Sequence, residues 1–428
     1  MSSAPRSRSA REAGRWSRRD FIRASGVVGV AGTFGLPGRL EARAKKFVYE
    51  EKKSSYEDNI YTRLFDVRPH VPGHDHITML GGSRMPPEVL QAMIEAADYH
   101  VDMEELIIAA GHRVAEVTKA EAGLVTCGSF AALLLGAAAC LTGTDKDKMT
   151  ALPHPTWDKR ECLIQKSQRF TYDRAYRAAG MTIVEVETRE QFMNALSPER
   201  TAMISVLARA QTAGDRNNTP DTLPLQEALA IAKKAGVPIM IDAASELPPA
   251  GNLTRFTTMG FDLVVISGGK GIRGPQGTGM LAGRADLVEA ARLNMAPFSN
   301  IGRGMKVPKE EIAGFITALN RYVALDHTAV LEDWSKKAKH IADKLQGIPG
   351  LTATYTVNQM GFGDVELKWD QKIIPLTEQQ ARDKLKAGQP RIVYNGTAIR
   401  TRCLKDGEEE LMAKRLRQFF REEARRLT

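Results

Sequence analysis

The feature that most constrains the fold is a series of short, mostly apolar runs separated by stretches of helical character. The runs are 123–126, 182–186, 202–207, 238–241 and 263–266. Apolar runs that alternate with helices are typical of a parallel sheet that helices cover on both faces. The sequence therefore predicts an α/β fold with a mostly parallel sheet, preceded by a helix that begins near Met85 with proline in its first turn.

The character of the sequence changes after about Val307. A long helical region to about Leu345 leads into four short β-like runs, at 352–357, 364–369, 391–394 and 399–404, and then into a charged helix from Glu408. This succession predicts a smaller α+β domain behind the large one. We expect four segments, namely a leader over 1–44, an N-terminal arm over 45–80, a large domain over 81–320 and a small domain over 321–428.

The N-terminal leader carries most of the net positive charge. Residues 1–44 hold nine Lys and Arg against three Asp and Glu, so +6 of the formal +9 lies there and the remaining chain carries +3. A body this close to neutrality offers little electrostatic basis for binding a phosphate backbone. We therefore expect no nucleic-acid partner.

The leader also resembles a twin-arginine export signal. The run SRRDFIR over 17–23 contains the arginine pair, an apolar run of 13 residues follows over 24–36, and ARA over 42–44 has the small-x-small pattern of a cleavage site. A permanent membrane anchor would need about 20 apolar residues. The resemblance implies passage through the twin-arginine export machinery to the periplasm or the medium; a basic tail with no targeting role is the alternative.

Polar residues follow three of the apolar runs at their carboxyl ends, where open parallel sheets bind ligands. Gly128 and Ser129 open an apolar helix, whose free N–H groups and dipole favour an anion, although Ser129 alone also fits a simple helix N-cap. Asp242 closes another run, and a carboxylate at that position is costly unless it meets a cation. Ser267 and Lys270 follow the last run.

Lys270 stands among glycines in the stretch GGKGIRGPQG over 268–277. A nucleotide-binding phosphate loop needs Ser or Thr after its lysine, but Gly271 follows here, so this stretch is not such a loop. A structural glycine-rich turn is the alternative. The strand-end residues together offer a phosphate site, a carboxylate for a protonated ring nitrogen and an amine for an aldehyde. Pyridoxal phosphate has all three of these handles.

Five motifs carry a resemblance to a known family: ITMLGGSRMPPEVLQAMIEAA, VDMEEL, IDAASELPP, DLVVISGGKGIRGPQGTGMLAGRADL and NIGRGMKVPKEEIAGFITAL. They resemble the fold-type-I pyridoxal phosphate enzymes of the L-seryl-tRNA(Sec) selenium transferase-like family, and most of all its D-glucosaminate-6-phosphate ammonia-lyase-like members. The resemblance extends from about Tyr61 to the C-terminus. It implies an aminotransferase-like large domain that binds pyridoxal 5'-phosphate.

The resemblance implies a role for each strand-end residue. Lys270 corresponds to the Schiff-base lysine, Asp242 contacts the pyridine nitrogen, and Ser267 with Gly128 and Ser129 holds the phosphate. Lys270 is also the expected catalytic base.

Three further cations enter only through the resemblance. Arg402 in RTRCL matches an arginine of the family's small domain that could hold a substrate carboxylate, and Arg303 and Lys306 in IGRGMK could reach an active site. That site could be a neighbouring subunit's, because fold-type-I sites usually lie at a dimer interface. A homodimer or a higher homo-oligomer is therefore expected. For all three residues, a surface cation or ion pair is the alternative.

The family and the residues together favour a lyase that acts on a small amino acid, with α,β-elimination and release of ammonia. An aminotransferase, a racemase or a selenium transferase-like transferase uses the same cofactor and is the alternative. Two alternatives belong to other classes of protein: a cofactor-free binding protein and a cytoplasmic tRNA-modifying transferase. True selenium transferases carry a tRNA-holding domain at the place where this sequence has the export leader. This difference disfavours the tRNA-modifying transferase.

His70, His74 and His76 lie in the loop-like segment RPHVPGHDH, which has no evident second set of ligands. We therefore expect no metal site and place this segment at the mouth of the substrate site. The four cysteines are scattered and form no C-x-x-C pair, so the sequence does not select a disulfide.

Overall fold

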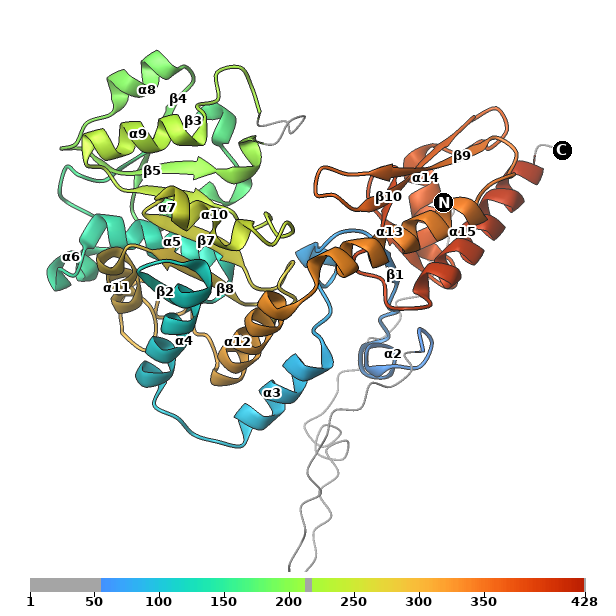
Figure 1. Cartoon of the computed structure of the whole chain (residues 1–428), viewed down its shortest axis with the longest axis horizontal. Helices are drawn as coiled ribbons and strands as arrows, with labels where there is room; N and C mark the ends of the chain where they lie inside the picture. The colour runs from blue at the N-terminus through green and yellow to red at the C-terminus, as the bar shows by residue number, and fades with distance from the viewer. Residues whose placement is uncertain (1–54, 212–217, 427–428) are drawn as a thin grey trace, which may run out of the picture. The chain divides into compact units, whose positions relative to one another are not determined.

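The computed structural model describes residues 55–211 and 218–426, which belong to the unit Val48–Thr428 (Figure 1). The predicted export leader over 1–44 lies outside the described residues. Within the described ranges, no helix is both long enough and apolar enough to cross a membrane.

A seven-stranded sheet organises the larger part of the chain. Its order is β2-β8-β7-β6-β5-β3-β4, and every neighbouring pair is parallel except the two pairs that include β8. The prediction of a mostly parallel sheet is confirmed. The strands are β2 (Ala122–Thr126), β3 (Glu161–Gln165), β4 (Thr182–Val186), β5 (Thr201–Leu207), β6 (Ile239–Asp242), β7 (Leu263–Ser267) and β8 (Gly279–Gly283).

Helices cover this sheet, and one of them is buried on nearly every side. In α5 (Gly128–Thr142), 11 of the 15 residues are buried, and the helix contacts β7, β8 and α11. A helix that is apolar all round is stable only inside a core. The remaining helices of this part are α3 (Pro87–Ala97), α4 (Met103–Thr118), α6 (Lys146–Ala151), α7 (Arg174–Ala178), α8 (Arg189–Ala195), α9 (Leu225–Ala235), α10 (Asn252–Met259), α11 (Ala285–Asn294) and α12 (Lys309–Ala324).

The C-terminal part has its own hydrophobic core. A three-stranded antiparallel sheet of order β12-β10-β9 packs with helices there, and the buried cluster includes Ala338, Val365 and Phe420. The two cores divide between Tyr322 and Ala338 along the chain. The elements are α13 (His327–Lys344), β9 (Leu351–Val357), β10 (Gly363–Trp369), α14 (Glu378–Ala387), β11 (Ile392–Tyr394), β12 (Ala398–Arg400) and α15 (Glu408–Arg425).

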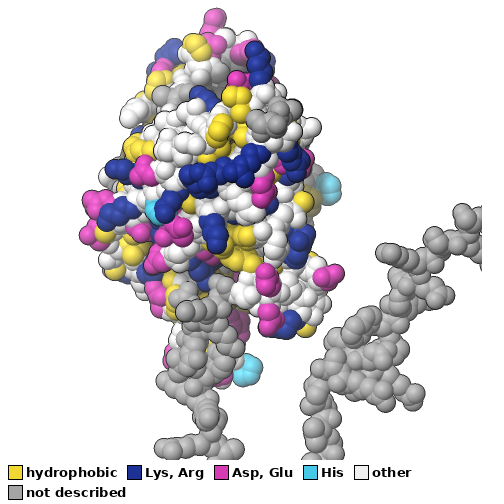
Figure 2. Space-filling model, turned by 90° about the vertical axis from the view of Figure 1, so that its right-hand side faces the viewer, with side chains coloured by type: hydrophobic (Ala, Val, Ile, Leu, Met, Phe, Trp, Pro, Cys, Tyr) yellow, Lys and Arg dark blue, Asp and Glu magenta, His cyan; other side chains and the backbone are white. Residues whose placement is uncertain are grey.

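The surface of the C-terminal helices carries charges of both signs. Figure 2 shows a face on which Lys and Arg side chains lie among Asp and Glu side chains. Lys337 of α13 binds Asp333 at 2.7 Å, and His340 of the same helix lies 2.7 Å from Glu410 of α15. Lys337 itself is 8% exposed, whereas its partner Asp333 and the His340–Glu410 pair reach the solvent, so the carboxylates and the histidine form a solvated face.

The segment before the large domain belongs structurally to the C-terminal part. Strand β1 (Val71–Gly73) pairs in parallel with β11, and Val71 lies in the second core. The arm predicted over 45–80 is therefore part of a folded unit from at least β1 onward, because its backbone hydrogen bonds are made to β11.

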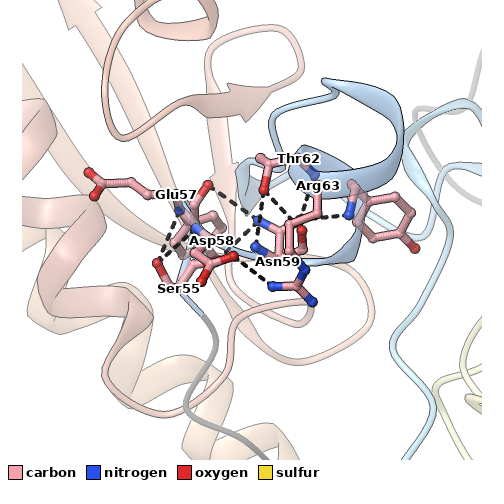
Figure 3. A network of polar contacts seen from close by, with 8 residues as sticks. Ser55, Glu57, Asp58, Asn59, Thr62 and Arg63 are labelled. Carbon is pink, nitrogen blue, oxygen red and sulfur yellow. Dashed lines mark hydrogen bonds and ion pairs between the residues drawn. The ribbon is translucent and has the colours of Figure 1, made fainter. Parts of the chain in front are cut away.

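The short helix α2 (Ile60–Phe65) precedes β1 and is capped by its own side chains. Asn59 Oδ1 accepts from the N–H groups of Tyr61 and Thr62 at 3.0 and 3.2 Å, and Thr62 Oγ1 accepts from the Asn59 N–H at 3.0 Å (Figure 3). None of the helix residues is buried. Its apolar side chains Tyr61, Leu64 and Phe65 are 56 to 66% exposed.

Several elements differ from the sequence prediction. The helical region to Leu345 is two helices, because Asp326 caps a new helix by accepting from the Ala329 N–H at 3.0 Å. The run predicted as a strand over 399–404 leaves the sheet after Arg400. Strands β1, β3 and β8 were not predicted, since β1 is short, β3 has only three apolar residues between Glu161 and Gln165, and β8 begins and ends with glycine.

Candidate active site

The sheet register brings the predicted strand-end residues to one edge. Thr126 of β2 and Ser267 of β7 both pair with Gly279 of the intervening strand β8. Asp242 of β6 pairs with Val265, two residues before Ser267. The ends of three strands thus place Asp242, Ser267 and the start of α5 along the same edge, as the sequence predicted for an open sheet.

The beginning of α5 lies directly on the sheet because Gly279 has no side chain. A Cβ added at Gly279 would lie 2.7 Å from both Gly128 C and Ser129 N. Gly128 has φ +79°, a left-handed conformation that favours glycine. The N-cap of α5 is Cys127, without a side-chain cap hydrogen bond, so Ser129 is not an N-cap. The first N–H groups of α5 therefore have no side-chain acceptor, which suits an anion.

Asp242 is a buried carboxylate, only 7% exposed. Its Oδ1 accepts from the Ala244 N–H at 2.9 Å, and it forms no ion pair within the described ranges. Burial raises the pKa of the Asp242 carboxyl, although that N–H and the nearby Lys270 charge act in the opposite direction. A protonated nitrogen beside Asp242 would relieve this desolvation cost.

Lys270 is held inside the structure and not on a solvated face. Its Nζ donates a hydrogen bond to Ser245 Oγ at 3.0 Å. Burial lowers the pKa of the Lys270 amine, and Arg209 adds to this effect, while Asp242 and Glu246 oppose it. An amine with a lowered pKa is unprotonated more often near neutrality, which imine formation and proton abstraction both require.

The glycines around Lys270 allow a close approach of two backbone segments. A Cβ at Gly269 would lie 2.7 Å from Gln276 Cα, and one at Gly271 would lie 2.5 Å from the Leu247 carbonyl oxygen. The Gly268 N–H donates to Thr278 O at 2.9 Å, and the Gly274 N–H donates to Gly268 O at 2.9 Å. The turn that holds Lys270 is thus tied to the start of β8 and to the loop after β6.

Ser245 was not singled out from the sequence. It stands three residues after Asp242 in IDAAS, in the turn that follows β6. The sequence offered one indication, which is that Ser245 follows the strand that ends in Asp242. A lone serine in a turn is too common to be selected on that ground.

The three cations predicted to bind substrate are not gathered with Lys270 by any contact in the described structure. Arg402 is 7% exposed and forms an ion pair with Asp75, and burial lowers its pKa to about 10. Arg303 and Lys306 are exposed in the segment between α11 and α12, and neither forms an ion pair with a described residue. Their roles toward a substrate stay predictions.

The segment RPHVPGHDH and the residues after it approach the lysine turn. Ser83 Oγ donates to Gly269 O at 2.9 Å, and Arg273 Nε donates to Arg84 O at 2.9 Å. His76 is 8% exposed, and burial together with the charges of Arg273 and Lys270 lowers its pKa to about 3. This segment therefore lies beside the turn of Lys270.

The other histidines of this segment contact each other. His70 Nε2 and His74 Nε2 are 2.7 Å apart, and His74 Nδ1 donates to the Asp75 carbonyl oxygen at 2.6 Å. Burial lowers the pKa of both imidazoles to about 4. In the described part of the chain, no three His, Cys, Asp or Glu side chains are grouped as metal ligands, and the four cysteines are free.

The residues at the sheet edge fit pyridoxal phosphate. The uncapped start of α5, next to Ser129 and Ser267, suits its phosphate, the unpaired Asp242 suits its ring nitrogen, and the Lys270 amine suits its aldehyde. The donor set therefore agrees in chemistry with the cofactor that the sequence predicts.

Comparison with known proteins gives the same result. The aminotransferase class-V family matches residues 165–359. A 5'-C-glycyluridine monooxygenase-decarboxylase from Streptomyces sp. is 31% identical over 373 residues, which is 83% of this chain and 90% of that protein. D-glucosaminate-6-phosphate ammonia lyase from Salmonella typhimurium (strain 14028s / SGSC 2262) is 25% identical over 84% of this chain and 98% of that protein.

The solved structures give the fold independently. A structure of D-glucosaminate-6-phosphate ammonia-lyase superposes with a TM-score of 0.76 and 24% identity, covering 86% of this chain and 99% of that one. The fold-type-I transferase architecture predicted from the sequence is confirmed. The chain is an enzyme of the aminotransferase class-V family, and its cofactor is pyridoxal phosphate.

Proposed function

We propose that this enzyme is a lyase that removes ammonia from a small amino acid by α,β-elimination, with Lys270 as cofactor anchor and base. The observation that carries the proposal is the partly buried Lys270 amine, which Ser245 holds on the same sheet edge as the unpaired carboxylate of Asp242. The similarity to D-glucosaminate-6-phosphate ammonia lyase over 98% of that protein supports this reaction class.

Each residue of the site would have a separate role in this reaction. When bound, pyridoxal phosphate draws electrons from the substrate Cα and weakens the bond to its hydrogen. Asp242 would keep the ring nitrogen protonated, because its buried carboxylate gains a counter-cation there. Gly128, Ser129 and Ser267 would hold the phosphate. The Lys270 Nζ, whose pKa is lowered by burial, would accept the Cα proton.

A second candidate reaction has a specific observation in its favour. The Streptomyces relative is named a monooxygenase-decarboxylase, and its 31% identity covers 90% of that protein. Loss of the substrate carboxylate with consumption of oxygen is therefore the first alternative to elimination. Transamination, racemisation and selenium transferase-like group transfer begin at the same Cα and remain alternatives of lower rank.

We further propose that the enzyme is exported. The twin-arginine pair, the apolar run and the cleavage pattern over 1–44 support passage through the twin-arginine machinery and a periplasmic or secreted location. Determination of the mature N-terminal mass in each cell fraction tests this. An intact residue 1–44 segment on cytoplasmic protein would contradict it.

We also propose a homodimer or a higher homo-oligomer. The exposed apolar side chains of α2 and the 91% exposed Met79 are the kind of surface that a second copy covers. Light scattering at several protein concentrations tests the oligomeric state. A monomer at all concentrations would contradict the proposal.

The visible spectrum of the purified protein tests the site and the reaction together. The wild type should show an imine absorption band that borohydride removes, and Lys270→Ala should lack it. Released ammonia, carbon dioxide and hydrogen peroxide are then measured for a panel of small D- and L-amino acids. Ammonia with a keto acid and without oxygen uptake supports the lyase. Oxygen uptake with carbon dioxide supports the second candidate.

A further inference from the structure

Strand β9 leaves one backbone edge of the C-terminal sheet open. It ends the strand order β12-β10-β9, and among the described residues it pairs with β10 alone (Figure 1). Its sequence LTATYTV contains no charged residue and no proline. Proteins usually protect an exposed edge with charges, proline or a covering segment, because its free N–H and C=O groups pair readily with another strand. The open edge of β9 is therefore a surface on which a further strand can pair.

The hydrogen bonds at the two ends of β9 show which of its backbone groups face outward. The Asn358 N–H donates to Phe362 O at 3.0 Å, and the Asp370 N–H donates to Gly350 O at 2.9 Å. In an antiparallel pair, residues that exchange hydrogen bonds alternate with residues that do not. The even-numbered residues of β9 therefore bond to β10, and the odd-numbered residues turn their N–H and C=O groups toward the open edge.

The open stretch of this edge is short and is centred on Tyr355. Toward the start of β9, Ala353 O already accepts a hydrogen bond from Gln346 Nε2 at 2.9 Å and has one lone pair left. Toward its end, the chain turns back into β10 after Val357. In the described part of the chain, the N–H groups of Ala353, Tyr355 and Val357 and the carbonyls of the last two bind no other group. These groups are available to a partner strand.

This stretch is complementary to a second copy of itself. When two copies pair antiparallel about a two-fold axis at Tyr355, Ala353 of each strand lies opposite Val357 of the other. All three outward residues of one strand then face the three of its partner and can exchange hydrogen bonds. The same register brings Thr354 opposite Thr356, and such threonine pairs stabilise sheets.

The position of α13 relative to Tyr355 extends this complementarity beyond the strand. An added Cβ at Gly363 would lie 2.3 Å from Tyr355 Cε2 and 3.1 Å from Ser335 Cα, so the ring of Tyr355 lies beside Ser335 of α13. A groove of about 510 Å³ separates the helix from β9 there, and its lining includes Glu332 and Lys339. A two-fold axis at Tyr355 therefore passes close to Ser335.

The charges of α13 beside the groove match under the same symmetry. Glu332 stands three residues before Ser335 and Lys339 stands four residues after it, and both side chains are exposed. Helices related by the two-fold axis run antiparallel, so Glu332 of one copy comes beside Lys339 of the other. Within the described ranges neither residue forms an ion pair in its own chain, whereas Asp333 of the same helix binds Lys337.

We propose that the open edge of β9 is an interface at which two copies of this chain pair, with the two Tyr355 residues opposite each other and Glu332 beside Lys339 of the other copy. The inference goes beyond the proposed function, because it requires neither the cofactor nor Lys270. It uses different residues from the exposed apolar surface of α2. An assembly that uses both contacts contains more than two copies.

The register is tested by comparing Tyr355→Cys with Val357→Cys in the holoenzyme. Residues that form a hydrogen-bonded pair have Cα atoms about 5.5 Å apart, which a disulfide can bridge. The two copies of residue 357 would lie about 14 Å apart, because each is opposite residue 353. Mild oxidation should crosslink Tyr355→Cys into a dimer that a reductant separates. Val357→Cys should crosslink no more than the wild type, whose four free cysteines give the background.

Two results of this experiment overturn the inference. One is equal crosslinking of both variants, which would show contact without the predicted register. The other is a Tyr355→Cys protein that forms no crosslink although its thiol reacts freely with a soluble reagent, which would show an open edge with a different occupant. The imine band and the melting curve establish beforehand that each variant is folded.

A charge exchange on α13 tests the same interface without changing the strand. Glu332→Lys and Lys339→Glu should each weaken self-association about 10-fold, because each turns two attractive pairs into repulsive ones. The double variant restores opposite charges and should return to within about threefold of the wild type. Sedimentation velocity over a range of protein concentrations measures this. Additive losses in the double variant overturn the inference, as does self-association that neither single variant changes.

Discussion

Lys270 Nζ donates a hydrogen bond to Ser245 Oγ at 3.0 Å, across two turns that follow neighbouring strands β6 and β7. The bond fixes the end of a flexible side chain in a partly buried place, where desolvation lowers the pKa of the amine. It therefore links the turn after Asp242 to the turn that carries the cofactor lysine.

Ser245→Ala should lower the catalytic efficiency of the holoenzyme without unfolding it. Loss of the hydroxyl leaves Nζ without its hydrogen-bond partner, so we expect about a 10-fold loss of kcat/KM and a changed pH dependence of the imine band. Ser245→Thr keeps the hydroxyl and serves as the matched control. An alanine variant with the wild-type rate and the wild-type spectral titration would show that the serine has no role at Lys270.

Asp242→Asn should lower the activity of the holoenzyme without lowering the stability of the apoprotein. Burial raises the pKa of the Asp242 carboxyl in the folded apoprotein, so the folded state binds its proton more tightly than the unfolded state does. The ionised carboxylate therefore lowers the free energy of unfolding, and this loss grows as the pH rises above the carboxyl pKa of about 4 in the unfolded state. The amide has no charge to bury.

We therefore expect apo Asp242→Asn to melt at or above the wild-type temperature at pH 7, with the difference shrinking toward pH 4. The holoenzyme activity should fall by at least about 100-fold, since the ring nitrogen loses its anionic partner. Calorimetry of both apoproteins across this pH range checks the first point and initial rates check the second. A variant less stable than the wild type at pH 7, with full activity, would contradict both.

Gly271→Ala should destabilise the lysine turn through a backbone clash. The new Cβ would lie 2.5 Å from the Leu247 carbonyl oxygen, which belongs to the chain and has little freedom to move. We expect a loss of about 1–3 kcal/mol in unfolding free energy, together with weaker cofactor binding. Gly251→Ala is the control, because nothing lies within 4 Å of its added Cβ. Equal denaturation midpoints for the two variants would argue against a packed turn.

The sequence predicted the position of a candidate site residue wherever that residue follows the end of a strand. Asp242 and Ser267 close apolar strands, and Lys270 follows one at once, so the parallel-sheet rule located all three. Ser245 was missed because it lies in a turn, where no periodicity marks a side chain. Only the hydrogen bond from Lys270 Nζ in the folded structure singles it out.

Long-range pairing explains the other differences from the sequence. Arg402 pairs with Asp75, which is 327 positions away, and no local pattern connects the two residues. Strand β1 escaped prediction for the same reason, since three residues pair with β11 far along the chain. Local propensity cannot report contacts that the tertiary fold creates.

The ion pair between Arg84 and Glu408 offers the last prediction. Glu408 is 7% exposed, accepts two bonds from Arg84 and a third from the Tyr56 hydroxyl at 2.6 Å, and also accepts from the Lys405 N–H at 2.9 Å. It joins the segment beside the lysine turn to the start of α15. Removing its charge takes the anionic partner from the Arg84 guanidinium, whose side chain is 32% exposed.

Glu408→Gln should therefore lower the unfolding free energy by about 1–2 kcal/mol, since charge-assisted hydrogen bonds are lost but solvent screens the partly exposed Arg84. Asp58→Asn removes the exposed pair between Asp58 and Arg63, whose side chains are 76% and 60% exposed, and should cost less than about 0.5 kcal/mol. Chemical denaturation of both variants measures the contrast. Equal midpoints would mean that the Glu408 pair is screened as effectively as a surface pair, and that the segment beside Lys270 is held by packing alone.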